Sequence, residues 1–369
     1  IGSGLVGSEM CIRDRGYSFI MTGCPATNML VSTYMKDLMK KTKPSHAYEA
    51  IKRNHAPGGM MSYESADDLK FYVKKGYCPG NAGKTLEWAF QDWGLSRMAL
   101  RMGKKSDAAL YEKRSRAWTP LFNKNIGLIL PKKENGEWLH TDPLNGQGWV
   151  EANAWQATWS VSHDLPKLVE LMGGGDAFCE KLNYAFEQAR PTDFVHAYSG
   201  GYVSYANQPG CSNAHLFTYG GQPWLTQYWV RQVKEHAYGG ITPDKGYGGH
   251  DEDEGQMGAV SALMSLGLFS VTGTEYDSPY YDITSPIFDK ITIKLNKDYY
   301  SGDEFVINVH NNSADNCYIQ KAELNGTDWI YAQLDHVDFA KGGTLNLWLG
   351  NMPNKSWGKL KYLGFKTNK

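Results

Sequence analysis

The sequence lacks a long hydrophobic run, an excess of charge of either sign and any close pairing of cysteines. No apolar segment approaches the roughly 20 residues that a membrane-spanning helix needs. With 38 basic and 39 acidic residues the net charge is −1, so no electrostatic attraction to nucleic acid or to an anionic membrane is expected. The six cysteines are scattered and none lies at metal-ligand spacing, so neither a zinc site nor a dense disulfide scaffold is indicated.

The N-terminal residues also lack the features of a targeting segment. The chain begins with Ile1, and residues 1–15 contain no apolar core with the flanks of a secretory signal. Residues 7–15 instead resemble translated sequencing-adapter sequence. We therefore expect residues 1–15 to be a sequencing artefact and the native N-terminal portion, with any export signal, to be missing.

Aromatic residues and glycine are abundant. The chain has 12 tryptophans, 23 tyrosines and 40 glycines. Flat rings that pack against sugar faces are one use of such an excess, so the composition favours a protein that faces polysaccharide. The structural alternative is a large helical core rich in aromatic residues.

Four carboxylates are consecutive at residues 251–254, between a glycine-rich turn and an apolar segment at 257–269. Like charges this close repel each other, and burial would raise the pKa of at least one of them. Such a cluster is stable when it holds a cation, takes part in acid–base chemistry or is solvated. The last case includes an exposed helix N-terminus, where acids interact favourably with the helix dipole. The motif alone leaves these alternatives open.

Between about residues 26 and 269 the apolar residues recur mostly at helical spacing, in segments separated by glycine, proline and asparagine. In the segment 84–102, for example, Leu86, Phe90 and Trp93 belong to one apolar side. The pattern predicts stacked helices at 27–40, 45–53, 66–74, 84–102, 105–121, 151–161, 164–171, 175–188, 211–236 and 255–269.

After Ser285 the apolar residues alternate instead, which predicts a small antiparallel β layer. The pair Asn325-Gly326 within it is a strong hairpin signal. The same pair also begins an N-glycosylation acceptor, and we prefer the hairpin interpretation. The predicted strands lie at 291–295, 305–309, 317–322 and 345–349.

Six motifs follow one another along the chain. The second of them, from Trp149 to Trp159, reads Trp-Val-Glu-Ala-Asn-Ala-Trp-Gln-Ala-Thr-Trp. It is similar to the Glu-Gly-Asn-Ala-Trp-Gln segment of the glycoside hydrolase family 92 α-mannosidases, and the other five occur in the order and approximate spacing of that family. The sequence therefore resembles this family from about residue 17 to the C-terminus. The six motifs lie at 84–93, 149–159, 207–209, 221–227, 251–257 and 285–290.

The resemblance implies a mainly α fold, in which an (α/α)6 barrel carries the active site after an N-terminal β-sandwich. We accordingly expect an incomplete barrel catalytic domain at 16–284, a C-terminal β-rich subdomain at 285–369 and a missing sandwich. The full-length parent is expected to be periplasmic or secreted.

The activity implied by the resemblance is that of a calcium-dependent, inverting exo-α-mannosidase that removes terminal mannose from glycans or mannans. Glu151 matches the general acid, and Asp251 with Asp253 matches the aspartate pair that activates the attacking water. Inversion requires the two carboxyl groups to be roughly 6.5–9.5 Å apart across one pocket. To stay protonated near neutral pH, Glu151 needs a dry, apolar neighbourhood, which Trp149 and Trp155 would help to supply.

Calcium is the expected cofactor, with Asn207, Gln208 and Asp253 as its ligands. Calcium accepts roughly 6–8 oxygen ligands from carboxylates, amides and carbonyls, and would hold the aspartates ionised. It would also grip sugar hydroxyls and help to flatten the mannose ring.

Four further residues are expected to contact the substrate, an α-mannoside glycan. For Trp88, packing in the core is the alternative, because its spacing on a predicted helix suits a buried ring. These four residues are Trp88, Asn153, Trp155 and Gln256.

The sequence also departs from the family pattern. Gln208 stands where many members have glutamate, residues 210–212 replace a serine and two histidines, and Ala152 replaces a glycine, so we expect a reshaped leaving-group subsite. Two alternatives are a non-catalytic carbohydrate-binding relative and another (α/α)6-barrel glycosidase. The chain as written is expected to hydrolyse little.

Overall fold

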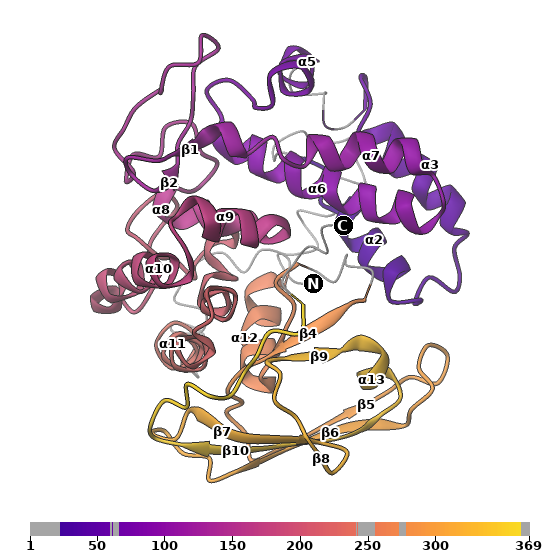
Figure 1. The fold of residues 1–369 in the computed structure, drawn as a ribbon, viewed down its shortest axis with the longest axis vertical. Coiled ribbons are helices and arrows are strands. Elements are labelled where there is room, and N and C mark those ends of the chain that lie inside the picture. The colour runs from indigo at the N-terminus through magenta and orange to yellow at the C-terminus, as the bar shows by residue number, and fades with distance from the viewer. Residues whose placement is uncertain are drawn as a thin grey trace.

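The computed structural model describes residues 23–59, 61, 66–240, 242, 255–272 and 278–362. The predicted artefact at residues 1–15 lies outside this part of the chain. In Figure 1 the helices form one body and the main β-sheet lies along its lower edge. No helix within the described ranges combines the length and apolarity needed to cross a bilayer.

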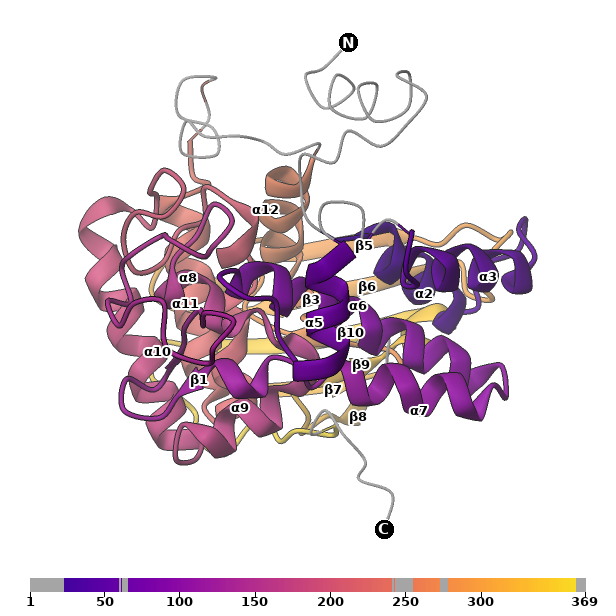
Figure 2. The ribbon, with the colours of Figure 1, turned by 90° about the horizontal axis from the view of Figure 1, so that it is seen from above.

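The first group of helices packs around α6. The cap of α6 is Asn81, whose side chain accepts a hydrogen bond from the Lys84 N–H at 2.8 Å. Figure 2 shows this group on one side of the molecule. Its helices are α2 (Ala26–Met35), α3 (Pro44–Asn54), α5 (Ala66–Lys75), α6 (Ala82–Arg101) and α7 (Lys105–Arg114).

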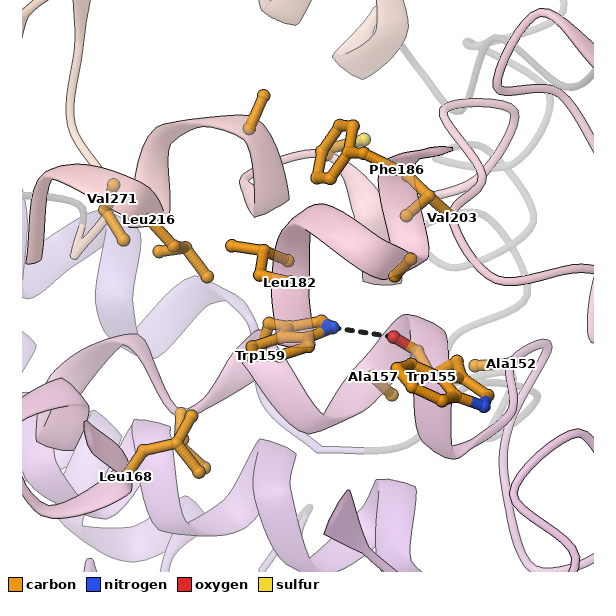
Figure 3. Close-up of a cluster of buried hydrophobic side chains, with 14 of the residues drawn as sticks. Ala152, Trp155, Ala157, Trp159, Leu168, Leu182, Phe186, Val203, Leu216 and Val271 are labelled. Atoms are coloured by element: carbon orange, nitrogen blue, oxygen red, sulfur yellow. Dashed lines mark hydrogen bonds between the residues drawn. The ribbon is translucent and has the colours of Figure 1, made fainter. Parts of the chain in front are cut away.

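The second group surrounds the largest hydrophobic core, in which Trp159, Leu182 and Phe186 are fully buried (Figure 3). The Trp159 indole N–H donates to the Trp155 carbonyl at 2.7 Å. This group comprises α8 (Ala154–Ala157), α9 (Leu165–Leu171), α10 (Gly175–Ala189), α11 (Pro223–His236) and α12 (Gln256–Leu266), with short 3-10 turns, among them η2 (Thr158–Ser160), η5 (Gln208–Gly210) and η6 (Asn213–Gly220).

Three predicted helices are shorter than expected. The segment 151–161 is a loop followed by α8 and η2, and the segment 211–236 divides into η6 and α11. The second break coincides with Gly221, which adopts a φ of 84°, and with Pro223 at the start of α11. Similarly, α12 ends at Gly267, whose φ of 73° closes the helix, and β3 (Leu268–Phe269) follows.

The main β-sheet has five strands in the order β5-β6-β10-β7-β8. The prediction of a purely antiparallel layer is wrong, because β10 lies between β6 and β7 and runs parallel to β6. This inserted strand returns from β9 through the helix α13 (His336–Ala340). The strands are β5 (Lys290–Lys294), β6 (Glu304–His310), β7 (Tyr318–Leu324), β8 (Thr327–Asp328) and β10 (Gly343–Gly350).

The hairpin prediction is confirmed. Leu324 pairs with Thr327, and between them Asn325 and Gly326 adopt φ angles of 51° and 78°. Two successive positive φ values are what a two-residue type I′ hairpin requires.

A smaller sheet crosses the predicted boundary at residue 285. Its order is β3-β4-β9, where β4 (Tyr280–Ile283) pairs with β9 (Gln333–Asp335). Leu268 and Ile283 also belong to the core of the β part. That core therefore draws on residues before the predicted boundary.

Helix α11 joins the helical and β parts. The Gln227 side chain accepts a hydrogen bond from the Ile319 N–H of β7 at 2.9 Å. The Arg231 guanidinium donates to the Ser285 hydroxyl at 3.0 Å and also to the Asn312 side chain. These contacts tie the sheet to the helices that surround the candidate site.

Candidate active site

The loop that precedes α8 presents Glu151 in a strained conformation. Glu151 has a φ of 52°, in the left-handed region that residues other than glycine rarely adopt. Such a conformation typically costs about 1–3 kcal/mol and persists where the surroundings fix it, most often at functional sites. The start of α6 supports this loop, because the Ala82 N–H donates to the Gly148 carbonyl at 2.8 Å.

Asn207 fixes the carboxyl group of Glu151 from the other side. Its amide nitrogen donates to Glu151 Oε2 at 2.9 Å and to the Glu151 carbonyl at 3.4 Å. Asn207 is buried, and its side-chain oxygen accepts the Gln208 N–H at 2.9 Å at the start of η5. The fold thus joins the second and third sequence motifs, whose residues are 56 positions apart.

The chain around Glu151 is apolar, as predicted. Trp149, Ala152, Ala154 and Trp155 are all buried, whereas Glu151 itself is partly exposed. The carboxyl group therefore lies at the edge of the core. It is hydrogen-bonded on one oxygen and not sealed from solvent.

Asn153 does not face a substrate. It is fully buried, its side-chain oxygen accepts the Gln156 N–H at 3.1 Å as the cap of α8, and its amide nitrogen donates to the carbonyls of Ser199 and Gly201 at 2.7 and 2.8 Å. The prediction of a sugar contact is therefore wrong for this arrangement. Asn153 instead ties the loop at 199–201 to the start of α8.

Trp88 is also a core residue. Its ring is 1% exposed and packs edge-on against Tyr72, with centroids 5.4 Å apart, in a buried cluster below α5 and α6. A ring without accessible surface cannot contact a glycan. The core-packing alternative therefore describes Trp88, and the prediction of a sugar contact is corrected.

Trp155 belongs to an aromatic group that the sequence did not reveal. It is 9% exposed and packs against Tyr202 and Tyr184, at centroid distances of 5.2 and 5.6 Å, while the Lys181 ammonium lies 5.2 Å from its centroid. Tyr184 is 47% exposed. The sequence signal was a tyrosine on the polar side of α10, which resembles an ordinary surface residue.

Gln256 is exposed at the start of α12, and the residue after it, Met257, is completely buried. Met257 Sδ lies 3.8 Å from Cys211 Sγ, and the Cys211 thiol donates to the Asn207 carbonyl at 3.4 Å. The start of α12 is therefore connected to Glu151 through Cys211 and Asn207. Asp251 and Asp253 lie outside the described residues.

The proposed calcium ligands are tested only in part. Among the described residues, no group of three or more histidine, cysteine, aspartate and glutamate side chains is placed to hold a metal ion. Asn207 retains one lone pair on its side-chain oxygen, and the Gln208 side chain makes no hydrogen bond to the described chain. Both offer the oxygen atoms that calcium prefers.

A separate cleft of about 540 Å³ lies between the end of α2 and the helix α13. It contains none of the predicted site residues. Several of its charged groups are already paired, for example Arg101 with Asp37 at 2.6 Å. We therefore place the candidate active site at Glu151 and Asn207.

Comparison with known proteins agrees with this placement. Residues 8–351 match the glycosyl hydrolase family 92 catalytic domain. The chain belongs to glycosyl hydrolase family 92. Both Glu151 and Asn207 lie within the matched region, so the strained acid and its amide partner are features of a family 92 catalytic domain.

Three relatives illustrate the similarity. An uncharacterized secreted glycosidase of Arthroderma benhamiae is 26% identical to this chain, over 92% of the chain and 46% of that protein. The family 92 inverting mannosidase BT2199 of Bacteroides thetaiotaomicron is 31% identical with a TM-score of 0.80, over 93% of this chain and 48% of its own. The α-mannosidase BT3965 of the same organism shares the fold, with 24% identity and a TM-score of 0.81 over 96% and 46%. The chain thus spans about half the length of these relatives.

Proposed function

We propose that this chain carries the catalytic residues of an inverting, calcium-dependent exo-α-mannosidase that removes terminal mannose from glycans or mannans. The observation that carries the proposal is the Asn207 amide held 2.9 Å from the carboxyl group of a backbone-strained Glu151. Membership of family 92 and the similarity to an inverting mannosidase support it. The relative described as a secreted glycosidase supports a secreted or periplasmic parent.

Glu151 is the general acid of the proposed reaction. Its partly exposed carboxyl group would protonate the departing glycosidic oxygen, while Asn207 fixes one carboxyl oxygen and leaves the other to reach the substrate. The left-handed backbone sets the direction of the side chain. Trp155, with Tyr202 and Tyr184, would form an apolar wall beside the leaving group.

Asp251 and Asp253 form the base in this proposal and activate the attacking water. Met257 follows Asp253 by four residues and is connected to Asn207 through Cys211. Four residues span at most about 14 Å of extended chain, so the acidic segment is tethered close to Glu151. This distance is compatible with the roughly 6.5–9.5 Å separation of carboxyl groups in inverting glycosidases.

Asn207, Gln208 and Asp253 are the residues that would hold calcium. When bound, the ion would supply Lewis-acid contact with sugar hydroxyls and keep the aspartates ionised. Asn207 would thereby orient the acid through its nitrogen and contribute to the metal site through its oxygen.

The test compares two substrates with different leaving groups in the complete protein that contains this chain. With 4-nitrophenyl α-mannoside, Glu151→Gln is expected to lower kcat by about 10²- to 10⁴-fold, the usual contribution of a general acid. With 2,4-dinitrophenyl α-mannoside, whose leaving group needs little protonation, the loss should be much smaller. Asp251→Asn and Asp253→Asn should be impaired equally on both.

Two further measurements complete the test. The first product seen by proton NMR should be β-mannose, and a calcium chelator should abolish turnover until calcium is restored. Equal turnover of α-glucosides would favour another (α/α)6-barrel glycosidase. Binding of mannosides without turnover would favour the non-catalytic carbohydrate-binding alternative.

A further inference from the structure

Helix α6 has one partly exposed face on an otherwise buried cylinder. Fourteen of its 20 residues are buried. Gly83, Glu87 and Phe90 are only partly buried, and they follow one another at i, i+4 and i+7. Residues at this spacing lie on one side of a helix. The sequence places a carboxyl group at the centre of this face.

The face is directed toward the loop that carries Glu151. A Cβ atom added at Gly83 would lie 3.2 Å from the Val150 nitrogen and 3.8 Å from Trp149 Cα. The first turn of α6 therefore packs against the two residues that precede Glu151. Glu87 projects from the same face one turn later, about 5–6 Å along from Gly83.

The carboxyl group of Glu87 is held on one side only. The Gln91 side chain donates to Glu87 Oε1 and accepts the Cys24 N–H at 2.7 Å. Within the described residues, Glu87 forms no ion pair and Oε2 has no hydrogen-bond partner. Burial raises the pKa of Glu87 to about 7, against the opposing effect of the Gln91 hydrogen bond.

A purely structural role does not require this carboxyl group. A neutral amide at position 87 would bond to Gln91 equally well and would avoid the cost of a desolvated, uncompensated charge. Desolvated carboxyl groups that lack a cation partner are instead typical of functional sites. Sugar hydroxyls are donors that a carboxylate in such a place binds strongly.

We propose that Glu87 is a third carboxyl group of the glycan pocket, where its free oxygen accepts a hydrogen bond from a hydroxyl of the bound sugar. This inference rests on the proposed function. It assigns Glu87 to substrate contact, separate from the acid Glu151 and from the aspartates at 251 and 253.

The test uses Glu87→Gln in the complete protein that contains the chain, assayed with 4-nitrophenyl α-mannoside. We expect kcat/KM to fall about 10- to 100-fold, the loss typical of one hydrogen bond to a charged group. The acidic limb of the kcat/KM profile should move to lower pH, and the melting temperature should not fall. Glu87→Asp, which keeps the charge but withdraws it, should lose a similar factor.

The matched control is Glu112→Gln on α7, where the carboxylate pairs with Arg97 at 3.1 Å on a neighbouring helix. This variant should keep the kcat/KM and pH profile of the wild type. If Glu87→Gln matches the wild type, or if it loses activity only with its melting transition, the inference is overturned while the proposed function stands. If the wild type cleaves no α-mannoside, both fail together.

Discussion

At the scale of single residues, Asn207 controls the orientation of Glu151. One amide nitrogen contacts both the side chain and the backbone carbonyl of Glu151. The same residue caps η5 through its oxygen. A single buried amide thus couples the loop before α8 to the loop before η6.

Asn207→Ala is expected to reduce kcat by about 10- to 100-fold, because a hydrogen bond to a charged group contributes about 1.5–3 kcal/mol. KM should change less, because the lost contact orients the acid and does not bind the sugar. The measurement is steady-state kinetics on an aryl α-mannoside. Asn354→Ala is the control, since Asn354 stabilises a surface turn through Ser356 at 3.0 Å; an equal loss in both variants would contradict the prediction.

The sequence predicted the identity of these residues better than their surroundings. Glu151 and Asn207 were chosen from separate motifs, and their contact depends on a fold that brings two distant loops together. Trp88 and Asn153 carry chemistry suited to sugars, yet both are consumed by packing and capping. Burial is decided by what other elements place over a side chain, which spacing within one element cannot reveal.

At the scale of elements, local signals were reliable where backbone chemistry dictates the outcome. The Asn325-Gly326 hairpin formed as predicted because both residues tolerate positive φ. The parallel position of β10 beside β6 was missed, since alternation indicates a strand but not its neighbour. The helix expected at 151–161 was missed because Glu151 leaves the helical region and Asn153 starts α8 only afterwards.

Strand β4 supplies a prediction about pH. Asp282 is fully buried, and burial raises its pKa from 3.8 to about 7 despite the hydrogen bonds from Tyr219 at 3.0 and 3.1 Å. The folded state therefore favours the protonated acid, and its contribution to stability is lost as pH rises from about 4 through 7. The slope is at most about 1.4 kcal/mol per pH unit.

Asp282→Asn should remove this slope, so that the difference in melting temperature between variant and wild type increases from pH 4 to pH 7. The measurement is thermal unfolding at a series of pH values. Asp303→Asn serves as control because the Asp303 side chain is 83% exposed. A constant difference across the series would show that Asp282 does not titrate in this range.

At the scale of the whole molecule, the chain matches relatives along nearly its full length while covering about half of theirs. Apolar side chains stay exposed on its first helices, notably Met29 at 64%, Val73 at 54% and Leu110 at 48%. Exposed apolar surface of this kind favours association with further protein. The (α/α)6 closure expected from the sequence stays a prediction.

We predict that the 369-residue chain alone hydrolyses an aryl α-mannoside at least about 100-fold more slowly than the complete protein that contains it, because small displacements of substrate-positioning groups have effects of this size. Initial rates of both, with size-exclusion chromatography to detect aggregation, provide the measurement. Adding the separately produced remainder should restore part of the activity. Equal specific activity would refute the prediction.

The pairing of β4 with β9 also limits how this fold can be rearranged. Because a strand from late in the chain completes a sheet begun beside α12, and because Gln227 and Arg231 bond to residues beyond 284, the C-terminal part is no transferable module. Recombination between two members of the family near residue 285 would mismatch both partners of each contact. Inheritance of the two parts as one block follows from this stitching.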